Sequence, residues 1–325
     1  GSSCDIFLNP EDKDTYFEPN GKSTRGFNQI HINAMFSLLD KRFTDILVQP
    51  ARKRNEYSAF CSMVDSADIP EYSKIVFFGD RGYTSYNNFA HVIERGQFFL
   101  IRCNDKRASG MMGHPVDILP AFDEDISLIL TRSKAITKYS RPELFSSYRY
   151  VYQNAPMDYL NDLTTEYDLS LRLLRIQLKD GSYENIATNL PRDEFKTEDF
   201  EMLYHLRWSE ENSFRDLKYS LCLKAFHSKK YAYIVQEVWA RVILYNFSSS
   251  IIINVTIKRE DCAYEYQANY SSALKTCRDF LRIHDGTTKI NVESLIAQNI
   301  EPIRPGRTFA RQHRFKLPMS FCYRH

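Results

Sequence analysis

The sequence lacks any continuous run of about 18 apolar residues, the length that a membrane-spanning helix requires. Its most apolar stretch, from Val242 to Val255, is interrupted by Asn246 and by three serines. We find no secretory signal, no internal repeat and no low-complexity tract, and glycine and proline are scarce. These absences exclude membrane-spanning and fibrous classes and predict a globular protein with one large domain or two smaller ones.

The cysteines of the chain are not grouped. The seven positions, which form no C-x-x-C pair and no zinc-binding spacing, are Cys4, Cys61, Cys103, Cys222, Cys262, Cys277 and Cys322. An odd, scattered set is typical of reduced, buried thiols. The sequence therefore predicts a cytoplasmic protein without a disulfide framework.

Positive charge has no overall excess, because the net charge is only +2. It gathers instead at the C-terminus, where residues 301–325 contain one acidic residue, Glu301, and six cations. The cations are Arg304, Arg307, Arg311, Arg314, Lys316 and Arg324. Such a basic tail is typical of an arm that contacts DNA phosphates. A solvated C-terminus has the same composition, so both interpretations stay open.

Apolar periodicity predicts the order of the elements. We expect a polar, turn-rich segment over 1–27, strands at 28–38, 45–50, 75–78 and 98–102, and helices at 52–67 and about 85–95. Residues 105–195 contain strand-like runs at 126–131, 169–178 and 183–189, with no strong helical period. The pattern is helical from 197 to about 255. This order predicts an α/β domain that carries an all-β insertion.

A first candidate site residue, Asp80, directly follows the predicted strand at 75–78. The carboxyl ends of strands in open α/β sheets are where sites form, because the loops diverge there. Gly79 and Gly82 allow tight turns on both sides of Asp80. An aspartate that caps the next helix would have the same surroundings, and for the three residues Asp80–Gly82 alone we favour that interpretation.

A second candidate site is a set of four polar residues with helical spacing: Tyr204, Arg207, Glu211 and Lys218. At roughly 100° per residue they share an arc of about 60° on one helix. A separate apolar arc contains Leu203, Leu206, Phe214, Leu217 and Leu221. Glu210 falls within that apolar arc, so Glu211 is the better metal ligand. An exposed face of ion pairs is the alternative interpretation.

The spacing Y-(2)-R-(3)-E-(6)-K of these residues resembles that of the bacterial insertion-sequence transposases of the "IS-four" group, which belong to the DDE class. Asp80–Tyr83 resembles the D-R-G-Y motif that contains the second acidic residue of that group. The further matches are the segments His31–Ala34, Thr188–Pro191 and Pro305–Arg307. The resemblance spans nearly the whole chain.

The resemblance implies a cut-and-paste transposase that cleaves and transfers DNA strands at transposon ends. Asp80 and Glu211 would be catalytic carboxylates that hold two Mg²⁺ ions, with Mn²⁺ as a substitute. Tyr204, Arg207 and Lys218 would bind DNA phosphates. The implied partners are double-stranded DNA, both terminal inverted repeats and target, and a second copy in a synaptic homodimer. The implied location is the bacterial cytoplasm, in association with the nucleoid.

The implied fold is an RNase-H-like catalytic core interrupted by an all-β insertion and followed by a mainly helical C-terminal region. We expect the first part of the core at 1–104, a β-rich insertion at 105–196, core helices with the glutamate motif at 197–255, and a C-terminal region with the basic tail at 256–325. The insertion accounts for the 131 positions between Asp80 and Glu211.

The sequence departs from the family pattern at the first catalytic aspartate. The family spacing places that aspartate immediately before Gly1, so the first core strand is expected to be missing and this chain to be inactive. Asp5 and Asp45 are poor substitutes, because one follows the expected strand and the other opens a different strand. If Gly1–Ser3 is instead a remnant of a tag, the register into Asn9 and Pro10 would be fortuitous.

Two rival functions remain. One is another metal-dependent nuclease or resolvase of RNase-H-like fold, which would lack the companions of Glu211. The other is an inactive or domesticated transposase remnant that binds DNA without cutting it, for which the absent aspartate is the only support.

The resemblance also implies cleavage through a DNA hairpin, with a flipped base stacked on an aromatic ring. Both tryptophans, Trp208 and Trp239, follow the insertion, so a ring from the insertion would be a tyrosine or a phenylalanine. Candidate tyrosines there are Tyr148, Tyr150, Tyr152, Tyr159 and Tyr183, five of the seven in residues 105–196.

Overall fold

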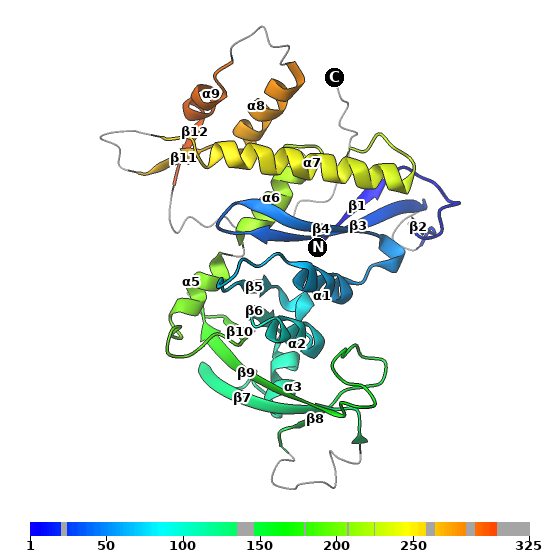
Figure 1. Cartoon of the computed structure of the whole chain (residues 1–325), viewed down its shortest axis with the longest axis vertical. Helices are drawn as coiled ribbons and strands as arrows, with labels where there is room; N and C mark the ends of the chain where they lie inside the picture. Colours follow the sequence, from blue (N-terminus) through cyan, green and yellow to red (C-terminus); the bar gives the residue numbers. More distant parts are fainter. Residues whose placement is uncertain are drawn as a thin grey trace. The chain divides into compact units, whose positions relative to one another are not determined.

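The computed structural model describes residues 1–20, 25–134, 146–178, 180–206, 208–223, 225–257, 264–283 and 290–303. It gives the backbone but not the side chains of residues 204–205, 208–211 and 283. The chain forms two compact units, one of residues 1–54 with 208–325 and one of residues 55–207 (Figure 1). The unit that contains both termini is called the terminal unit below, and residues 55–207 are called the central unit.

The terminal unit contains an antiparallel sheet with β3 at its centre. Its strands are β1 (Ser2–Ile6), β2 (Tyr16–Phe17), β3 (Phe27–Ser37) and β4 (Arg42–Pro50), followed by the short helix η1 (Ala51–Lys53). β3 and β4 agree with the strands expected at 28–38 and 45–50, because Ile30, Ile32 and Ile46 are buried on one face. Residues 1–27, for which only a polar, turn-rich segment was expected, also contain a strand, since Ser2–Ile6 pair with Asn28–Ile32.

Four described helices pack with this sheet in one apolar core. They are α6 (Trp208–Tyr219), α7 (Tyr231–Ile252), α8 (Tyr270–Ile283) and α9 (Val292–Gln298), with β11 (Tyr266–Ala268) paired to β12 (Ile300–Pro302). Asn246 on α7 bonds both the N–H and the C=O of Phe43 on β4, at 2.8 Å each, which fixes the helix along the strand (Figure 1). One apolar core joins Ile32 of the sheet to Leu217 of α6 and Val238 of α7.

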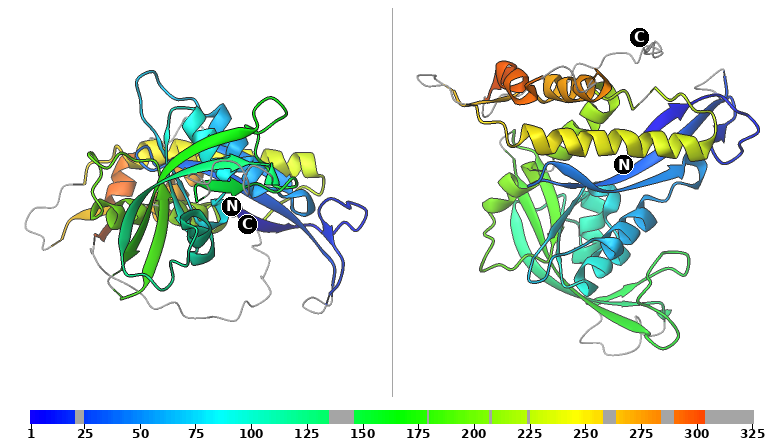
Figure 2. Two further views of the ribbon diagram at one scale, coloured as in Figure 1. Left: turned by 90° about the horizontal axis from the view of Figure 1, so that it is seen from below. Right: turned by 45° about the horizontal axis from the view of Figure 1, so that its top comes forward.

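The central unit is built on a six-stranded mixed sheet of order β5-β6-β10-β9-β7-β8. The strands are β5 (Val76–Gly79), β6 (Phe98–Cys103), β7 (Phe122–Thr131), β8 (Tyr148–Tyr150), β9 (Glu166–Gln177) and β10 (Tyr183–Thr188). β5 is parallel to β6, while β10 is antiparallel to both β6 and β9. The strands expected in the insertion therefore extend the sheet of β5 and β6, which Figure 2 shows from two further directions.

The helices of the central unit are α1 (Glu56–Ser66), η2 (Arg81–Tyr83), α2 (Tyr86–Glu94), α3 (Asp105–Met112) and α5 (Asp199–His205). α1 and α2 agree with the helices expected at 52–67 and 85–95. α3 corrects the expectation of an all-β block after residue 104. Asn104 caps α3 through the N–H of Arg107, and Gly113 ends it in the left-handed conformation, so local capping makes a helix where apolar periodicity is weak. The domain boundaries at 104 and 196 remain predictions.

His91 links α1 and α2 of the central unit to the loop before β9. Its Nδ1 lies 2.8 Å from Asp65 on α1, and its Nε2 lies 2.9 Å from Asp158 in the loop. Asn87 completes the junction by bonding both the N–H and the carboxylate of Asp158. Burial lowers the pKa of His91, but the hydrogen bonds and charges of the two carboxylates outweigh burial and leave it raised.

We expect this junction to make the central unit less stable as pH rises. A histidine whose folded pKa lies above its unfolded value stabilises the fold below the unfolded pKa, and this contribution disappears as pH rises through the folded pKa. The melting temperature should therefore fall more steeply for the wild type than for His91→Gln as pH is raised from mildly acidic to mildly alkaline values. Equal slopes for the two proteins would contradict the charged bridge.

Among the described residues no helix is long and apolar enough to cross a membrane. Of the described cysteines, Cys4, Cys61, Cys103 and Cys277 are buried free thiols and Cys222 is a half-buried one, whereas Cys262 and Cys322 lie outside the described residues.

Candidate functional site

Asp80 directly follows β5 in the central unit, at the carboxyl edge of the parallel pair β5–β6. Its side chain is exposed, and its Oδ1 accepts the N–H of Gly82 at 2.7 Å, so Asp80 is the N-cap of η2. Both sequence interpretations of Asp80 thus describe the same residue: it follows a strand, and it caps a turn. The cap fixes one carboxylate oxygen and leaves the exposed side chain at an edge where ligands bind in α/β sheets.

The residues around Asp80 hold this turn rigidly. The ring of Tyr83 packs 5.5 Å from that of Phe60 on α1, and Thr84 donates to the carbonyl oxygens of Arg81 and Arg102. A Cβ added at Gly82 would clash with Asp80 Oδ1 at 2.9 Å and would lie 3.8 Å from Glu56 Oε2, so the Glu56 carboxylate is also close to this turn. Glu56 is a neighbour that sequence patterns did not single out, because its only signal is its place in the first turn of α1.

The expectation of one continuous helix through Tyr204 and Lys218 is wrong. α5 ends at His205 and α6 begins at Trp208, so Tyr204 and Glu211 belong to different helices. The N–H of Leu206 bonds both Met202 and Leu203, which closes α5 in a tight last turn. Arg207 lies outside the described residues, as do the side chains of Tyr204 and Glu211.

The break has a physical cause, because the apolar side chains on its two sides enter different cores. Leu203 packs in a core of the central unit with Phe200 and Leu174. Phe214, Leu217 and Leu221 pack in the core of the terminal unit. Leu206, which was expected on a continuous apolar face, is 44% exposed. One straight helix could not place its two halves in separate cores, and helical periodicity alone does not reveal the change of core.

Lys218 on α6 bonds the first strand of the chain. Its Nζ donates to Ser2 Oγ on β1, and it lies 5.8 Å from the ring of Phe214. Cys4, two residues further along β1, lies in the same core as Leu217. α6 therefore packs on the face of β1 that carries Ser2 and Cys4.

Strand register shows in which direction α6 runs over β1. Ser2 pairs with Ile32, whereas Phe36 lies further along β3 and pairs with Phe43. Lys218 is next to Ser2, but Phe214, one turn earlier, meets Phe43 at 5.8 Å between ring centroids. Towards its N-terminal end, α6 therefore runs along the sheet in the direction from Ile32 to Phe36 of β3.

Alternation along β1 decides which side chains face α6. Residues of one parity share a face of a strand, so Ser2 and Cys4 lie on the face toward α6. Asp5 has the opposite parity and bonds Gln29 at 2.9 Å. Asp45 has the opposite parity to the buried Ile46 on β4. Asp5 lies within β1, which corrects the expectation that it follows the first strand, and the interpretation that neither aspartate replaces the first carboxylate stays a prediction.

The other two described family-like motifs have structural roles. Asn189 bonds the N–H of Phe99 at 2.8 Å and the C=O of Gln97 at 2.9 Å, which joins the end of β10 to the start of β6. His31 of β3 bonds Ser3 of β1 at 3.0 Å, and Asn33 bonds Gln49 of β4 at 3.1 Å. The segment Pro305–Arg307 and the cations of the basic tail lie outside the described residues.

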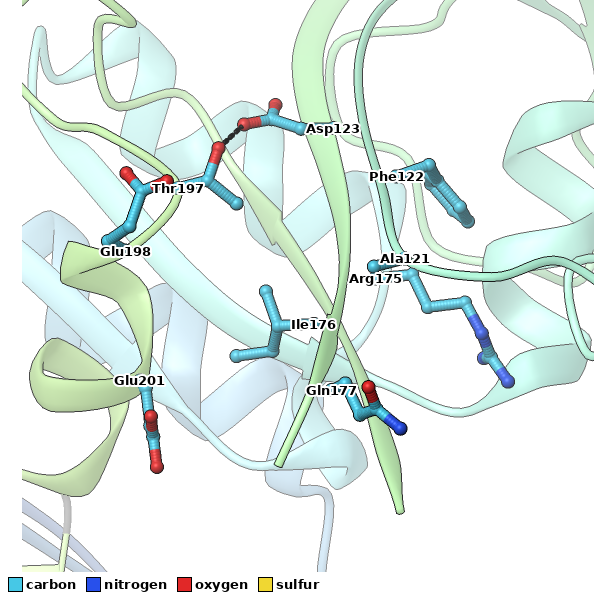
Figure 3. A pocket seen from close by; sticks show the side chains of 9 residues that line it. All are labelled: Ala121, Phe122, Asp123, Arg175, Ile176, Gln177, Thr197, Glu198 and Glu201. Carbon is cyan, nitrogen blue, oxygen red and sulfur yellow. Dashed lines mark hydrogen bonds between the residues drawn. The ribbon is translucent and has the colours of Figure 1, made fainter. Parts of the chain in front are cut away.

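Metal ligands are not grouped within the described part of the chain, where no three histidine, cysteine or acidic residues converge. Asp80 and Glu211 belong to different units, so their separation stays a prediction. A hollow of about 350 Å³ in the central unit is lined by Asp123, Thr197, Glu198 and Glu201, among others (Figure 3). It lies at β7, β9 and α5, away from Asp80, and the Asp123 carboxylate within it is engaged by Thr197. We therefore assign no chemistry to this hollow.

The comparisons with known proteins place the chain in a family. A family profile described as "Transposase DDE domain" matches residues 9–247. Among solved structures, the chain is similar to one described as "Cryo-EM structure of piggyBac transposase synaptic complex with hairpin DNA", with 11% identity, a TM-score of 0.40 and coverage of 91% of this chain and 56% of that one. This chain thus spans little more than half the length of that protein. Curated proteins gave no match. Because the family profile covers well over half of the sequence, the chain belongs to the transposase DDE-domain family.

Proposed function

We propose that this chain is the catalytic part of a transposase of the IS-four group that cleaves transposon ends and transfers the freed strand to target DNA. The observation that carries the proposal is Asp80, an exposed carboxylate at the carboxyl edge of β5 and β6 within a turn held from both sides. Glu211, in the first half of α6, is the second carboxylate of the proposal, and Lys218 follows it two turns later on the same helix.

The donor chemistry suits a hard divalent cation. Carboxylate oxygens are the ligands that Mg²⁺ prefers, and an exposed aspartate at a strand end leaves room for water and phosphate oxygens as further ligands. Asp80 and Glu211 would hold the metal, with a first aspartate from the residue before Gly1. When bound, a metal pair supplies activation of the attacking water or 3′-hydroxyl and stabilisation of the leaving oxygen. The residues of this chain hold and orient the phosphodiester for that attack.

The cations and the fold complete the proposal. Lys218, which lies on α6 next to the start of β1, would contact phosphates of the bound DNA end, together with Arg207 and Tyr204. The RNase-H-like core of the proposal follows from the family resemblance. Double-stranded DNA is the proposed partner, and two copies would hold the two ends.

The test compares residues 1–325 with a version lengthened at the N-terminus by the coding sequence upstream, which we expect to supply an aspartate directly before Gly1. The substrate is DNA that flanks the gene. We expect the lengthened chain to cleave it with Mg²⁺ and not with EDTA, and the given chain to be slower by orders of magnitude. An otherwise identical extension with asparagine at that position is the control.

Two outcomes would contradict parts of this proposal. Robust Mg²⁺-dependent cleavage by residues 1–325 would mean that the first carboxylate lies within them. Binding without cleavage by the lengthened chain would favour the alternative, a remnant that binds DNA without cutting it.

We also propose cleavage through a DNA hairpin, with Tyr152 as the stacking ring. Of the five tyrosines named above as candidates, Tyr148 is buried, and Tyr183 lies under the guanidinium of Arg175. Tyr152 is 67% exposed, and Arg132 donates to its backbone carbonyl at 2.8 Å. The neighbouring Tyr150 ring, which Lys134 approaches to 5.3 Å, meets the Tyr152 ring edge to face.

In the lengthened chain, Tyr152→Ala should reduce formation of the hairpin species roughly ten- to hundredfold, since stacking of one base on an aromatic ring contributes about 1–3 kcal/mol. Tyr152→Phe should retain it. Denaturing gels of pre-nicked ends measure the species directly. A double-strand break with no hairpin at any time would remove this part of the proposal.

A further inference from the structure

A second carboxylate lies beside the turn that holds Asp80, and it comes from a different element. Asn55 caps α1 by accepting the N–H of Ser58 at 3.0 Å, so that the helix begins at Glu56. A carbon atom attached to Gly82 would lie 2.9 Å from Asp80 Oδ1 and 3.8 Å from Glu56 Oε2. The two carboxylates therefore share one small region of the protein.

The face of α1 that carries Glu56 packs against this turn. Glu56 and Phe60 are four residues apart, so they lie one turn after the other on the same face of the helix. The ring of Phe60 packs 5.5 Å from that of Tyr83, and Tyr83 donates its N–H to the carbonyl oxygen of Asp80 at 3.0 Å. Both carboxylates belong to the central unit, so their proximity is a property of that unit by itself.

A glutamate in the first turn of a helix also has a simpler explanation. The positive end of the helix dipole stabilises a carboxylate there, and Glu293 occupies a similar place in α9, after an asparagine cap formed by Asn291. The helix dipole does not account for the second carboxylate beside Glu56, however. Two like charges next to one turn repel each other, and a divalent cation would offset that repulsion.

We propose that Glu56 is a further carboxylate of the metal site at Asp80, where it bonds to a water held by the ion. The proposal rests on the proposed function for the presence of an ion at Asp80. Mg²⁺ gives up its waters reluctantly and is usually bound directly by only one or two carboxylates. A carboxylate that accepts a hydrogen bond from such a water orients the site without touching the ion. Glu56 is therefore a positioning residue, and Asp80 is the ligand.

Binding of Mn²⁺ to residues 1–325 in the absence of DNA tests this role. Electron paramagnetic resonance measures the free Mn²⁺ that remains at each protein concentration. Glu56→Gln should weaken binding about ten- to a hundredfold, which is the usual effect of removing an outer partner of a metal site. Asp80→Asn should weaken it at least as much. Glu293→Gln, which removes a glutamate from a similar helix position, should leave Mn²⁺ binding unchanged.

The double variant decides whether both carboxylates act on one ion. If they do, Glu56→Gln should have no further effect once Asp80→Asn has removed the ligand. Additive losses, or unchanged Mn²⁺ binding by Glu56→Gln, would overturn the proposal. A lower melting temperature for both Glu56→Gln and Glu293→Gln, with unchanged Mn²⁺ binding, would assign Glu56 to the helix dipole instead.

A second measurement locates the ion. Fe²⁺ in place of Mg²⁺, with ascorbate and hydrogen peroxide, generates hydroxyl radicals that cut the backbone next to the metal. Mass spectrometry of the wild type should find cuts both at the start of α1 and at the turn that follows Asp80, and cuts at the turn alone would contradict the role of Glu56.

These experiments separate the new proposal from the function on which it rests, because they use neither DNA nor the lengthened chain. Mn²⁺ binding that depends on Asp80 but not on Glu56 would contradict only the role of Glu56. Mn²⁺ binding that depends on neither residue would contradict the metal site of the proposed function as well.

Discussion

In the chain lengthened to include the first aspartate, Asp80→Asn and Glu211→Gln should each reduce Mg²⁺-dependent strand cleavage by several orders of magnitude while leaving binding of DNA ends intact. Each substitution removes one anionic metal ligand and keeps the shape of the side chain, so the loss is expected in chemistry and not in affinity. Cleavage of labelled ends and gel-shift affinity, measured on the same preparations, separate the two effects.

The structure offers a matched control for Asp80. Asp180 accepts the N–H of Ser182 at 2.9 Å, the same turn geometry in which Asp80 accepts the N–H of Gly82. Asp180→Asn should leave cleavage unchanged. If the two variants lose equal activity, the effect of Asp80→Asn comes from its turn and not from metal binding.

The same assignment requires Asp80 and Glu211 to meet in the active complex. Their carboxylates must come within roughly 10 Å to share a metal pair. A structure of the lengthened chain on a DNA end measures this separation directly, and a larger distance in that complex would contradict the assignment.

Arg172→Met should be the most destabilising single change outside the apolar cores, lowering the free energy of unfolding by about 3–5 kcal/mol. Arg172 is 3% exposed in β9 and donates to both carboxylate oxygens of Asp123, at 2.7 and 2.6 Å. It also donates to the carbonyl of Phe195 and lies over the ring of Phe200. Removing the cation takes two donors from the Asp123 carboxylate, whose side chain is 12% exposed, and one donor from the carbonyl of Phe195.

Arg192 provides the comparison, because it bonds the same carboxylate from the surface. It lies 2.9 Å from Asp123 and its side chain is 44% exposed. Arg192→Met should cost at most about 1 kcal/mol. Urea unfolding of the two variants measures the difference, and equal losses would contradict the burial of the Arg172 pair. Burial alone would raise the pKa of Asp123, but Arg172, Thr197 and Arg192 hold it below its usual value. The pair should therefore weaken as pH falls through that lowered pKa.

Much of the secondary structure could be predicted from local patterns. The strands β3 to β6 and the helices α1 and α2 follow from alternation and apolar runs, because each buries one face against a single core. β1 was missed, since five residues with one fully buried side chain give too short a pattern. α3 was missed because its signals are caps rather than periodicity.

The family was predictable because its motifs are short spacings along the sequence, and the match over residues 9–247 confirms the transposase family, though not the IS-four group. The position of Asp80 after a strand was predictable for the same reason. The roles of the motif residues were less predictable, because Asn189 bonds Phe99 and His31 bonds Ser3, and each pair joins strands that are far apart in the sequence.

The sequence by itself therefore determined the family, most strands and helices, and the location of Asp80 at the end of a strand. The tertiary structure decided where the chain passes from one core to the other. Helical periodicity continues through residues 203–221, but Leu203 and Phe214 enter different cores, and the helix breaks between them. Periodicity reports that a face is apolar and not which surface it meets, so only the packed chain could reveal that break.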